Sequence, residues 1–297
     1  MTTKCGLVAV IGAPNAGKST LVNALVGQKV AIVSPKAQTT RARLMGIALA
    51  DETQIVLADT PGIFAPKRRL DRAMVNAAWE GAQEADAILL VVDSVKQRRH
   101  ELLPLIETLR DRPERKLLVL NKVDAGKKEP LLALAQELTG AAGFDEVFFV
   151  SALSGDGVTE LKARLAEMMP EGPWLYPEEQ VSDASERLLA CEITREQLYR
   201  QLHDELPYDS AVRHEKYIQR KDGSVEIHQQ IVVTRDNQRA IVLGKGGSRI
   251  KAIGEAARKE LTELLGQKVH LFLHVRVEEN WAEAKDLYEE LGLEWVK

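Results

Sequence analysis

The stretch GAPNAGKST, at residues 12–20, constrains the fold of this chain more than any other feature. It follows the apolar run CGLVAVI and precedes a helical pattern, so it fits the GxxxxGK[ST] phosphate loop in its required place between a buried strand and a helix. Glycines let backbone N–H groups turn toward phosphate oxygens, Lys18 places a positive charge near the β- and γ-phosphates, and the Ser19 hydroxyl can bind Mg²⁺. We therefore predict that the phosphates of a nucleotide bind at Gly12, Ala13, Pro14, Asn15, Ala16, Gly17, Lys18, Ser19 and Thr20.

Short apolar runs alternate with helical patterns up to residue 170, which is typical of a mostly parallel sheet wrapped by helices. Strands are expected at 7–12, 53–59, 87–93, 116–121 and 147–151, with an antiparallel edge strand at 44–50. The fold class of this part is therefore an α/β phosphate-loop domain.

The stretch MPEGPWLYPEEQ ends this pattern, because its prolines cannot continue a helix. We predict a first domain at 1–172, a linker at 173–182 and a second domain at 183–297. The second domain has the pattern of an α+β module of different build. Its elements are expected in the order helix 183–204, strand 211–220, an Asp222-Gly223 turn, strand 224–233, a short helix, the turn GKGG, a long helix to 265, strand 268–277 and helix 278–292.

The composition indicates a globular protein, with 45% hydrophobic and 28% charged residues in a chain of 297. A formal net charge of −4 argues against wholesale coating by nucleic acid, so any basic binding surface must be local. Cys5 and Cys191 match no metal spacing and are expected to be reduced thiols. The chain shows no signal peptide and its longest apolar runs are too short to span a bilayer, so a cytoplasmic protein is expected.

Two further motifs end predicted strands of the first domain. DTPG at 59–62 places Asp59 where it can hold Mg²⁺ through water, and lets the N–H of Gly62 approach a γ-phosphate. NKVD at 121–124 carries Asp124, whose carboxylate can accept two parallel N–H bonds from N1 and the 2-amino group of guanine. Adenine offers an acceptor and no amine at those positions, so the motif favours guanine.

The neighbours of Asp124 have supporting roles in this interpretation. Asn121 is expected to brace the phosphate loop, and Lys122 is expected to lie over the plane of the base. The stretch SAL ends another strand, where the N–H of Ala152 could meet guanine O6. By itself this last signal is weak. The residues of SAL are Ser151, Ala152 and Leu153.

In the order GAPNAGKS, QTTR, DTPG, NKVD and SAL, residues 12–153 resemble the G domain of translation-factor-type small GTPases, specifically the TrmE-Era group. The resemblance implies that Thr40, the second threonine of QTTR, is the switch residue that reaches Mg²⁺ when GTP is bound. Without the resemblance, a polar loop with threonines is normally just a loop. The expected metal ligands are Ser19, Thr40 and Asp59, and the expected catalytic residues are Lys18, Asn15, Thr40 and Gly62.

Ile63 departs from a pattern of many small GTPases, which carry a water-orienting glutamine after the DxxG glycine. Isoleucine cannot orient water, so either another group does so or the unassisted rate is very slow. The resemblance to GTPases with PNxGKS implies that Asn15 holds a potassium ion, which would neutralise developing phosphate charge. The alternative is that Asn15 only shapes the loop.

The second domain contains the turn GKGG between a short helix and a long amphipathic helix. Such a turn lets a single-stranded sugar-phosphate backbone come close, while flanking apolar residues form a groove for unstacked bases. Basic residues exceed acidic ones between 235 and 259, giving a local charge of about +5. The order of elements resembles a type II KH domain. RNA contacts are expected from Gly244, Lys245, Gly246, Gly247, Arg249, Ile250 and Lys251.

A TrmE-Era type G domain followed by a KH domain implies a GTP-hydrolysing switch that binds the 3′ end of 16S rRNA during assembly of the 30S subunit. The residues themselves support a guanine-nucleotide switch joined to a binder of single-stranded nucleic acid. A monomer without stable membrane insertion is expected, and the peripheral membrane contact of the family has no visible amphipathic anchor here. Two alternatives stay open: an ATP-using phosphotransferase or helper ATPase, and a binding module whose second domain contacts protein.

Overall fold

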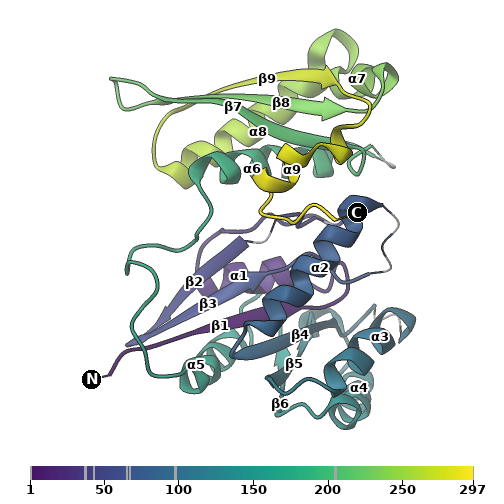
Figure 1. Ribbon diagram of the computed structural model, residues 1–297, viewed down its shortest axis with the longest axis vertical. Helices are drawn as coiled ribbons and strands as arrows, with labels where there is room; N and C mark the ends of the chain where they lie inside the picture. The colour runs from purple at the N-terminus through teal and green to yellow at the C-terminus, as the bar shows by residue number, and fades with distance from the viewer. Residues whose placement is uncertain are drawn as a thin grey trace. The chain divides into compact units, whose positions relative to one another are not determined.

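The chain divides into two units in the computed structural model (Figure 1), which describes residues 2–36, 39–42, 44–64, 66, 68–96, 99–203 and 206–296. The first unit comprises Met1–Val33, Thr40–Asp183 and Leu291–Lys297, and the second comprises Ser34–Thr39 and Ala184–Glu290. The units therefore differ from the predicted domains in where the QTTR loop and the last residues belong. Gln38 of that loop lies outside the described residues.

The first unit is built on a sheet with the strand order β2-β3-β1-β4-β5-β6. Strand β2 runs antiparallel to β3, and the other neighbours are parallel. Strands buried on both faces are near-continuous apolar runs, which is why the sequence pattern located them. The predicted α/β fold with one antiparallel edge strand is confirmed. The strands are β1 Lys4–Ile11, β2 Leu44–Ala50, β3 Thr53–Asp59, β4 Ala87–Asp93, β5 Arg115–Asn121 and β6 Glu146–Val150.

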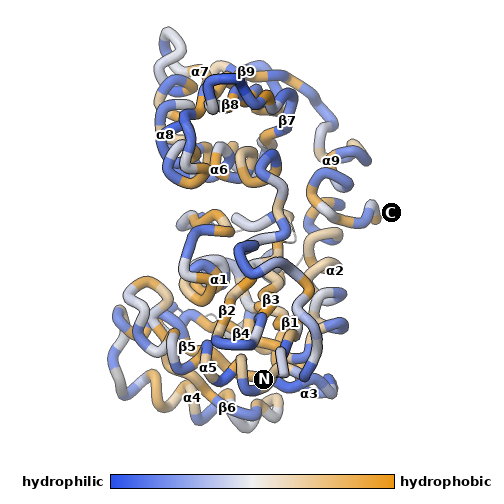
Figure 2. Tube along the Cα trace, turned by 90° about the vertical axis from the view of Figure 1, so that its left-hand side faces the viewer, coloured by the Kyte–Doolittle hydropathy of each residue, from blue (hydrophilic) through white to orange (hydrophobic). Residues whose placement is uncertain are grey.

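Helices cover both faces of this sheet (Figure 1). On one face, α1 (Lys18–Val26) and α5 (Val158–Met168) pack against the strands in one core cluster. On the other face, α2 (Arg69–Gln83), α3 (Arg99–Arg110) and α4 (Lys128–Ala142) form a second cluster with the strands. Hydrophobic segments run through the strands between these layers (Figure 2).

The carboxyl ends of the parallel strands lie next to one another, at one end of the sheet. Val10 of β1 pairs with Asp59 of β3, and Asp93 of β4 pairs with Asn121 of β5. Polar residues at the ends of these strands are therefore brought together at the edge where parallel sheets bind their ligands.

The stretch at 173–182, predicted as a linker, belongs to the first unit. The N–H of Tyr176 donates to Gln54 Oε1 at 3.0 Å, and the N–H of Ile47 donates to Val181 O at 2.8 Å. Proline ends a helix but is compatible with an extended segment along a sheet edge. The prolines therefore mark the end of the helical pattern and not the end of the unit.

The second unit contains a sheet with the order β7-β8-β9, in which β7 and β8 are antiparallel and β8 and β9 are parallel. Its core includes Leu198, Ile231 and Ile253, one each from α6, β8 and α8. The predicted α+β order of helix, two strands, two helices and a strand is confirmed. The elements are α6 Glu186–Gln201, β7 Ser210–Gln219, β8 Val225–Val233, α7 Asp236–Leu243, a 3₁₀ turn at Lys245–Gly247, α8 Ser248–Leu265 and β9 Val269–Val277.

The last helix is shorter than the predicted 278–292. Helix α9 covers Lys285–Glu290 and follows a 3₁₀ turn at Trp281–Glu283. The Trp281 side chain is 4% exposed, and its Nε1–H donates to Asp209 O at 3.3 Å. The predicted helix is therefore interrupted where the Trp281 side chain is buried. Neither α9 nor any other helix in the described part of the chain is long and apolar enough to cross a bilayer.

Candidate functional sites

The loop between β1 and α1 carries the predicted phosphate cradle. Its last glycine, Gly17, is the N-cap of α1 and has φ 94°, a value that residues with a side chain rarely adopt. A Cβ at this position would lie 2.3 Å from Asn121 Nδ2. Because Gly17 has no side chain to cap α1, the first N–H groups of the helix and the positive end of its dipole face an incoming anion.

Lys18 is almost completely buried, with 6% of its surface exposed. Its ammonium donates to the backbone carbonyls of Gly12 and Ala13 at 3.3 and 3.0 Å. Burial lowers the pKa of Lys18 to about 8, and the negative charge of Asp59 opposes that shift. The loop therefore holds a positive charge in a poorly solvated place, where an anionic phosphate would stabilise it.

Three oxygen atoms meet beside the phosphate loop. Ser19 Oγ lies 2.8 Å from Asp59 Oδ2 and 2.9 Å from Thr40 Oγ1, and Thr40 Oγ1 lies 3.2 Å from the same carboxylate oxygen. Mg²⁺ binds six oxygens at about 2.0–2.1 Å in an octahedron, whose edges are therefore about 2.9 Å long. Ser19 Oγ and Thr40 Oγ1 are separated by the length of one such edge, and the Asp59 carboxylate lies beside both, where it could bind the ion directly or through water. The structure thus brings together the three residues that the sequence predicted as metal ligands.

The DTPG loop is joined to the phosphate loop beside Gly62. The N–H of Ile63 donates to Gly12 O at 3.0 Å. The Ile63 side chain packs against the core cluster of α2, α3 and α4. Position 63 therefore offers a backbone contact that orders the loop, and its side chain has no polar atom that could orient a water molecule.

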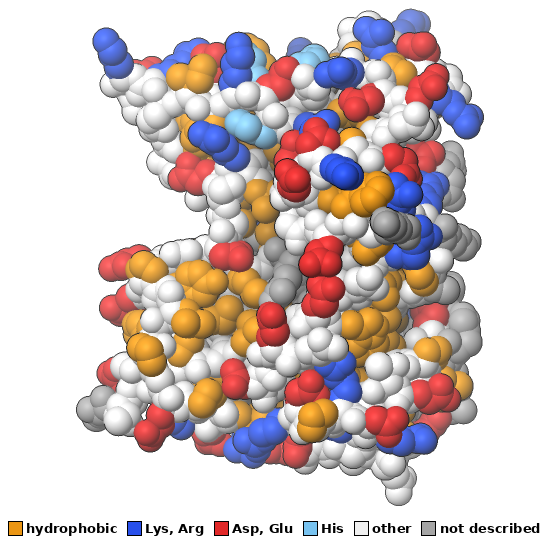
Figure 3. Space-filling view, viewed as in Figure 1, with side chains coloured by type: hydrophobic (Ala, Val, Ile, Leu, Met, Phe, Trp, Pro, Cys, Tyr) orange, Lys and Arg blue, Asp and Glu red, His pale blue; other side chains and the backbone are white. Residues whose placement is uncertain are grey.

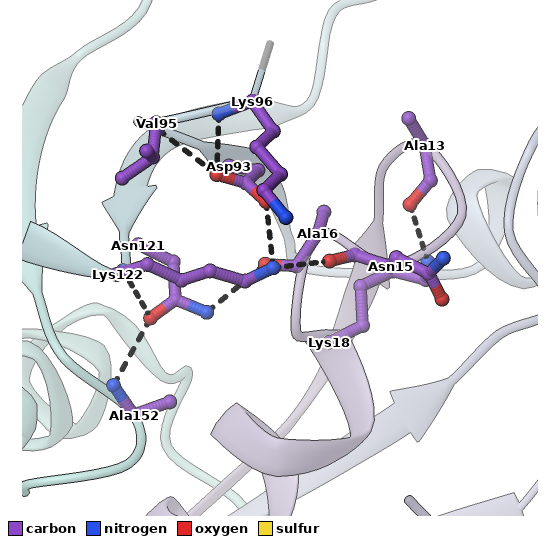
Figure 4. A network of polar contacts seen from close by, with 10 residues as sticks. All are labelled: Ala13, Asn15, Ala16, Lys18, Asp93, Val95, Lys96, Asn121, Lys122 and Ala152. Carbon is purple, nitrogen blue, oxygen red and sulfur yellow. Dashed lines mark hydrogen bonds and ion pairs between the residues drawn. The ribbon is translucent and has the colours of Figure 1, made fainter. Parts of the chain in front are cut away.

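Asn121 connects the base motif to two other loops (Figure 4). Its Nδ2 donates to Ala16 O at 3.0 Å, which is the contact to the phosphate loop that the sequence predicted. Its Oδ1 accepts the N–H groups of Lys122 at 2.8 Å and Ala152 at 3.0 Å. The Ala152 N–H, expected at guanine O6, is therefore already bound to a protein acceptor.

Asp124 lies exposed in a 3₁₀ turn, Val123–Ala125, directly after β5. The SAL residues follow the neighbouring strand β6, where Ser151 is buried and Leu153 is 83% exposed. Thr20 is half-buried in the first turn of α1. An exposed carboxylate at the carboxyl edge of the sheet can meet a base that enters from solvent.

Asp93 is a residue of this site that the sequence patterns did not reveal. It ends β4, and its Oδ2 accepts a hydrogen bond from Lys122 Nζ at 2.6 Å. The same ammonium donates to the backbone carbonyl of Asn15 at 2.7 Å. Asp93 ends its strand as Asp59 and Asn121 end theirs, so its position in the chain was the signal that could have identified it.

The turn between α7 and α8 presents predicted RNA contacts to solvent. Lys245 and Gly246 are exposed, and the Lys251 side chain is 76% exposed. Gly246 has φ 60°, which favours glycine, and no heavy atom lies within 4 Å of a Cβ built there. Gly244 ends α7 and Gly247 precedes α8, so the turn has room for the backbone of a single strand.

Two other predicted RNA contacts have partners inside the second unit. Arg249 Nη1 donates to Gln201 O, at the end of α6, at 2.9 Å. Ile250 is half-buried and packs against the core of this unit. These two residues hold the start of α8 against α6, so they fix the position of the turn.

Most basic side chains of residues 235–259 are exposed, in agreement with the local positive charge predicted for this segment. On the face of the second unit that Figure 3 shows, Lys and Arg side chains are mixed with Asp, Glu and His side chains. The excess of positive charge is a local property of residues 235–259, because residues 184–290 as a whole carry 17 Lys and Arg against 19 Asp and Glu. The exposed basic residues are Arg235, Arg239, Lys245, Lys251, Arg258 and Lys259.

Known protein families match both parts of the chain. Residues 7–122 match a family described as 50S ribosome-binding GTPase, and residues 205–282 match the KH domain family. The chain is 74% identical over 299 residues to the GTPase Era of Erythrobacter litoralis, covering 99% of this chain and 98% of that protein. It is 56% identical over 295 residues to the GTPase Era of Bradyrhizobium diazoefficiens, covering 99% and 96% of the two chains.

Two solved structures of Era have the same fold. A variant of Era from Aquifex aeolicus bound to GDP·AlF4⁻ has a TM-score of 0.89 and 37% identity, with 98% of this chain and 99% of that chain covered. Era in complex with MgGDPNP and nucleotides 1506–1542 of 16S ribosomal RNA has a TM-score of 0.90 and 36% identity, with the same coverage. The predicted pairing of a G domain with a KH domain is confirmed.

Asn121→Ala is expected to destabilise the nucleotide-free protein by about 3 kcal/mol, because three hydrogen bonds are lost and two N–H groups lose their acceptor. Urea denaturation of the full chain measures the change. Asn237→Ala is the control, since Asn237 is exposed and bonds the adjacent Gln238 N–H. The control should change stability by less than about 0.5 kcal/mol. Equal effects of the two substitutions would show that Asn121 does not brace the loops.

Proposed function

Because the chain belongs to the Era family of GTPases, we propose that it binds GTP with Mg²⁺ and uses GTP hydrolysis to control its binding of ribosomal RNA. The RNA is single-stranded and lies at the 3′ end of 16S rRNA, and the process is assembly of the 30S subunit. The KH match and the Era complex with MgGDPNP and 16S nucleotides support this proposal. Such a factor acts as a monomer in the cytoplasm, where ribosomal subunits are assembled.

The observation that carries the proposal is the division of one loop between the two units. Thr40 belongs to the first unit, where its hydroxyl meets Ser19 and Asp59. Thr39 belongs to the second unit, and its carbonyl accepts a hydrogen bond from Arg195 Nη2 at 2.5 Å. Adjacent residues are thus held by different units. A nucleotide that positions Thr40 also sets the path of Thr39.

The anchor of this loop in the second unit is itself fixed. Arg195 and Glu192 are each 3% exposed and form an ion pair one turn apart on α6. Lys36, from the same loop, donates through Nζ to Leu202 O just after α6. The ion pair fixes Arg195 on α6, and the loop is held there by Arg195 at Thr39 O and by Leu202 O at Lys36, so we expect the loop and α6 to move together. We infer that the nucleotide state reaches the second domain through this loop.

In the proposed GTP complex, Lys18 and the first N–H groups of α1 bind the phosphates. Ser19, Thr40 and Asp59 would hold Mg²⁺, which would supply positive charge to neutralise the phosphates. The N–H of Gly62 approaches the γ-phosphate. Thr40 is thereby sensitive to whether a γ-phosphate is present.

In the same complex, the base lies at the carboxyl ends of β5 and β6. Asp124 accepts the N1–H and the 2-amino group of guanine, and the aliphatic stem of Lys122 covers the ring. Asn121 links this motif to the phosphate loop, because its Nδ2 donates to Ala16 O while its Oδ1 accepts the N–H of Lys122. This arrangement favours GTP over ATP, so an ATP-using enzyme is the less favoured alternative.

Ile63 cannot orient a water molecule. A cation bound at Asn15 could compensate for this. The Asn15 side chain is exposed, and its carbonyl is fixed by Lys122. We propose that its side-chain oxygen binds potassium, which would neutralise charge in the transition state. Asn15 also has φ 64°, a conformation that asparagine tolerates, so loop shaping alone would explain it without an ion.

RNA and nucleotide are expected to bind with reciprocal coupling. A single-stranded RNA with the 3′-terminal sequence of 16S rRNA should bind about 5- to 150-fold tighter with a non-hydrolysable GTP analogue than with GDP. Fluorescence anisotropy with the full chain measures both affinities. Gly246→Asp should remove RNA binding, whereas Gly266→Asp, with φ 62° at the other end of α8, should not. Equal RNA affinity in the two nucleotide states would contradict the switch.

Asp124→Asn is expected to weaken GTP binding by about a hundredfold or more and to favour xanthosine triphosphate, whose C2 carbonyl accepts the new amide N–H. Competition against a fluorescent nucleotide gives the affinities. Asp111→Asn is the control, because Asp111 is exposed and precedes β5 at the opposite edge of the sheet. If ATP competes as well as GTP with the parent chain, the assignment of guanine is wrong.

GTP turnover is expected to be at least about tenfold faster in KCl than in NaCl if Asn15 binds potassium. Phosphate release under single-turnover conditions measures the rates. Asn15→Gly keeps access to φ 64° and removes the side-chain oxygen, so it should lose the potassium response without losing the loop conformation. A potassium response retained in Asn15→Gly would leave loop shaping as the role of Asn15.

A further inference from the structure

The ammonium of Lys122 is held by two groups from different loops (Figure 4). Nζ donates to Asn15 O at 2.7 Å and to Asp93 Oδ2 at 2.6 Å. Lys122 and Asn15 both have left-handed backbone conformations, with φ 68° and 64°, which residues with a side chain adopt at a cost. The contact therefore joins two strained positions, one in the base motif and one in the phosphate loop.

The two oxygens of the Asp93 carboxylate have different partners. Oδ2 accepts from Lys122, whereas Oδ1 accepts the N–H groups of Val95 and Lys96, each at 2.9 Å. The side chain is 13% exposed. Burial alone would raise the pKa of Asp93, but hydrogen bonds from Lys122 and from the two backbone N–H groups outweigh burial and hold that pKa below its usual range. A charged carboxylate therefore faces the ammonium.

We propose that Asp93 is a positioning residue for the guanine nucleotide, which fixes the Lys122 stem over the base and, through the Lys122 ammonium, the Asn15 carbonyl of the phosphate loop. This proposal rests on the proposed function, because it takes the base to lie at Lys122. The contacts of Asp93 described above are all with protein groups. Because both of its carboxylate oxygens already accept hydrogen bonds from protein groups, Asp93 acts on the nucleotide through Lys122 in this proposal.

The physical effect is pre-organisation of a long side chain. A lysine with a single carbonyl partner keeps much of its rotamer freedom, and ordering it when the base binds costs free energy. With Asp93 in place, the stem is ordered before the base arrives, so less freedom is lost on binding. The charge matters as well as the shape, because charge-assisted hydrogen bonds are about twice as strong as neutral ones.

Asp93→Asn tests this role, because the amide oxygen can still accept the Val95 and Lys96 N–H groups, while the amide NH2 that would face Lys122 carries no negative charge and cannot accept a hydrogen bond. Release of a fluorescent GDP analogue from the full chain should be about tenfold faster than from the parent. The KM for GTP should rise in parallel, while kcat changes by less than about twofold, since Asp93 does not touch the reacting phosphate.

A matched control lies at the other end of the same strand. Asp86 is exposed, precedes β4, and accepts the N–H of Leu7 through Oδ2 at 2.8 Å. Asp86→Asn therefore removes a carboxylate with a similar structural contact at the edge away from the nucleotide. It should release the GDP analogue at the parent rate.

Testing Asp93→Asn in a Lys122→Met variant separates a positioning role from a general structural role. In Lys122→Met, adding Asp93→Asn should change release by less than about twofold, because the group through which Asp93 acts is gone. A similar acceleration in both backgrounds, or an unchanged release rate in Asp93→Asn alone, would overturn the proposal. If the parent chain binds guanine nucleotides no better than adenine nucleotides, the proposed function fails instead, so the two failures are distinguishable.

Discussion

When helices cover both faces of a sheet, polar side chains are placed mainly at the ends of its strands, because the faces are filled by apolar packing. In the first unit, both faces of the sheet are filled by apolar clusters, and the parallel register places the carboxyl ends of β1, β3, β4 and β5 side by side. Asp59, Asp93 and Asn121 occupy those ends, so one predicted metal ligand, the carboxylate that holds Lys122 and the amide that joins the loops all follow from one constraint. The loops that follow these strands thus lie together where parallel sheets bind their ligands.

Asn121 holds the loops that follow these strands together by hydrogen bonds. Its amide joins the loops after β1, β5 and β6, and Gly17 passes so close to it that a Cβ would lie 2.3 Å from Nδ2. The glycine therefore serves two purposes, since it gives α1 an uncapped N-terminus and lets the base motif touch the phosphate loop. The predicted phosphate loop and the predicted base motif are therefore joined directly by the hydrogen bond from Asn121 Nδ2 to Ala16 O.

Much of this could be predicted from the sequence, because strands buried on both faces are near-continuous apolar runs. The runs at 53–59 and 87–93 coincide with β3 and β4. The contacts of Asp93 could not be predicted, since an aspartate after a strand satisfies an ordinary turn equally well. Arg249 beside the GKGG turn matched an RNA contact, and only the tertiary structure shows that it bonds Gln201 O. The assignment of Thr39 and Thr40 to different units likewise depends on packing that no local pattern records.

The buried ion pair of α6 includes Arg195, which contacts the loop that contains Thr39 and Thr40. Glu192 and Arg195 are almost fully buried, yet a buried pair is often no more stabilising than well-packed apolar side chains of the same volume. Stability alone therefore does not explain why α6 carries it. An apolar pair would fill the space but could not donate to the carbonyl of Thr39, the residue adjacent to Thr40. The pair instead fixes a directional contact within the second unit, to the residue that directly precedes Thr40 of the first unit in the chain.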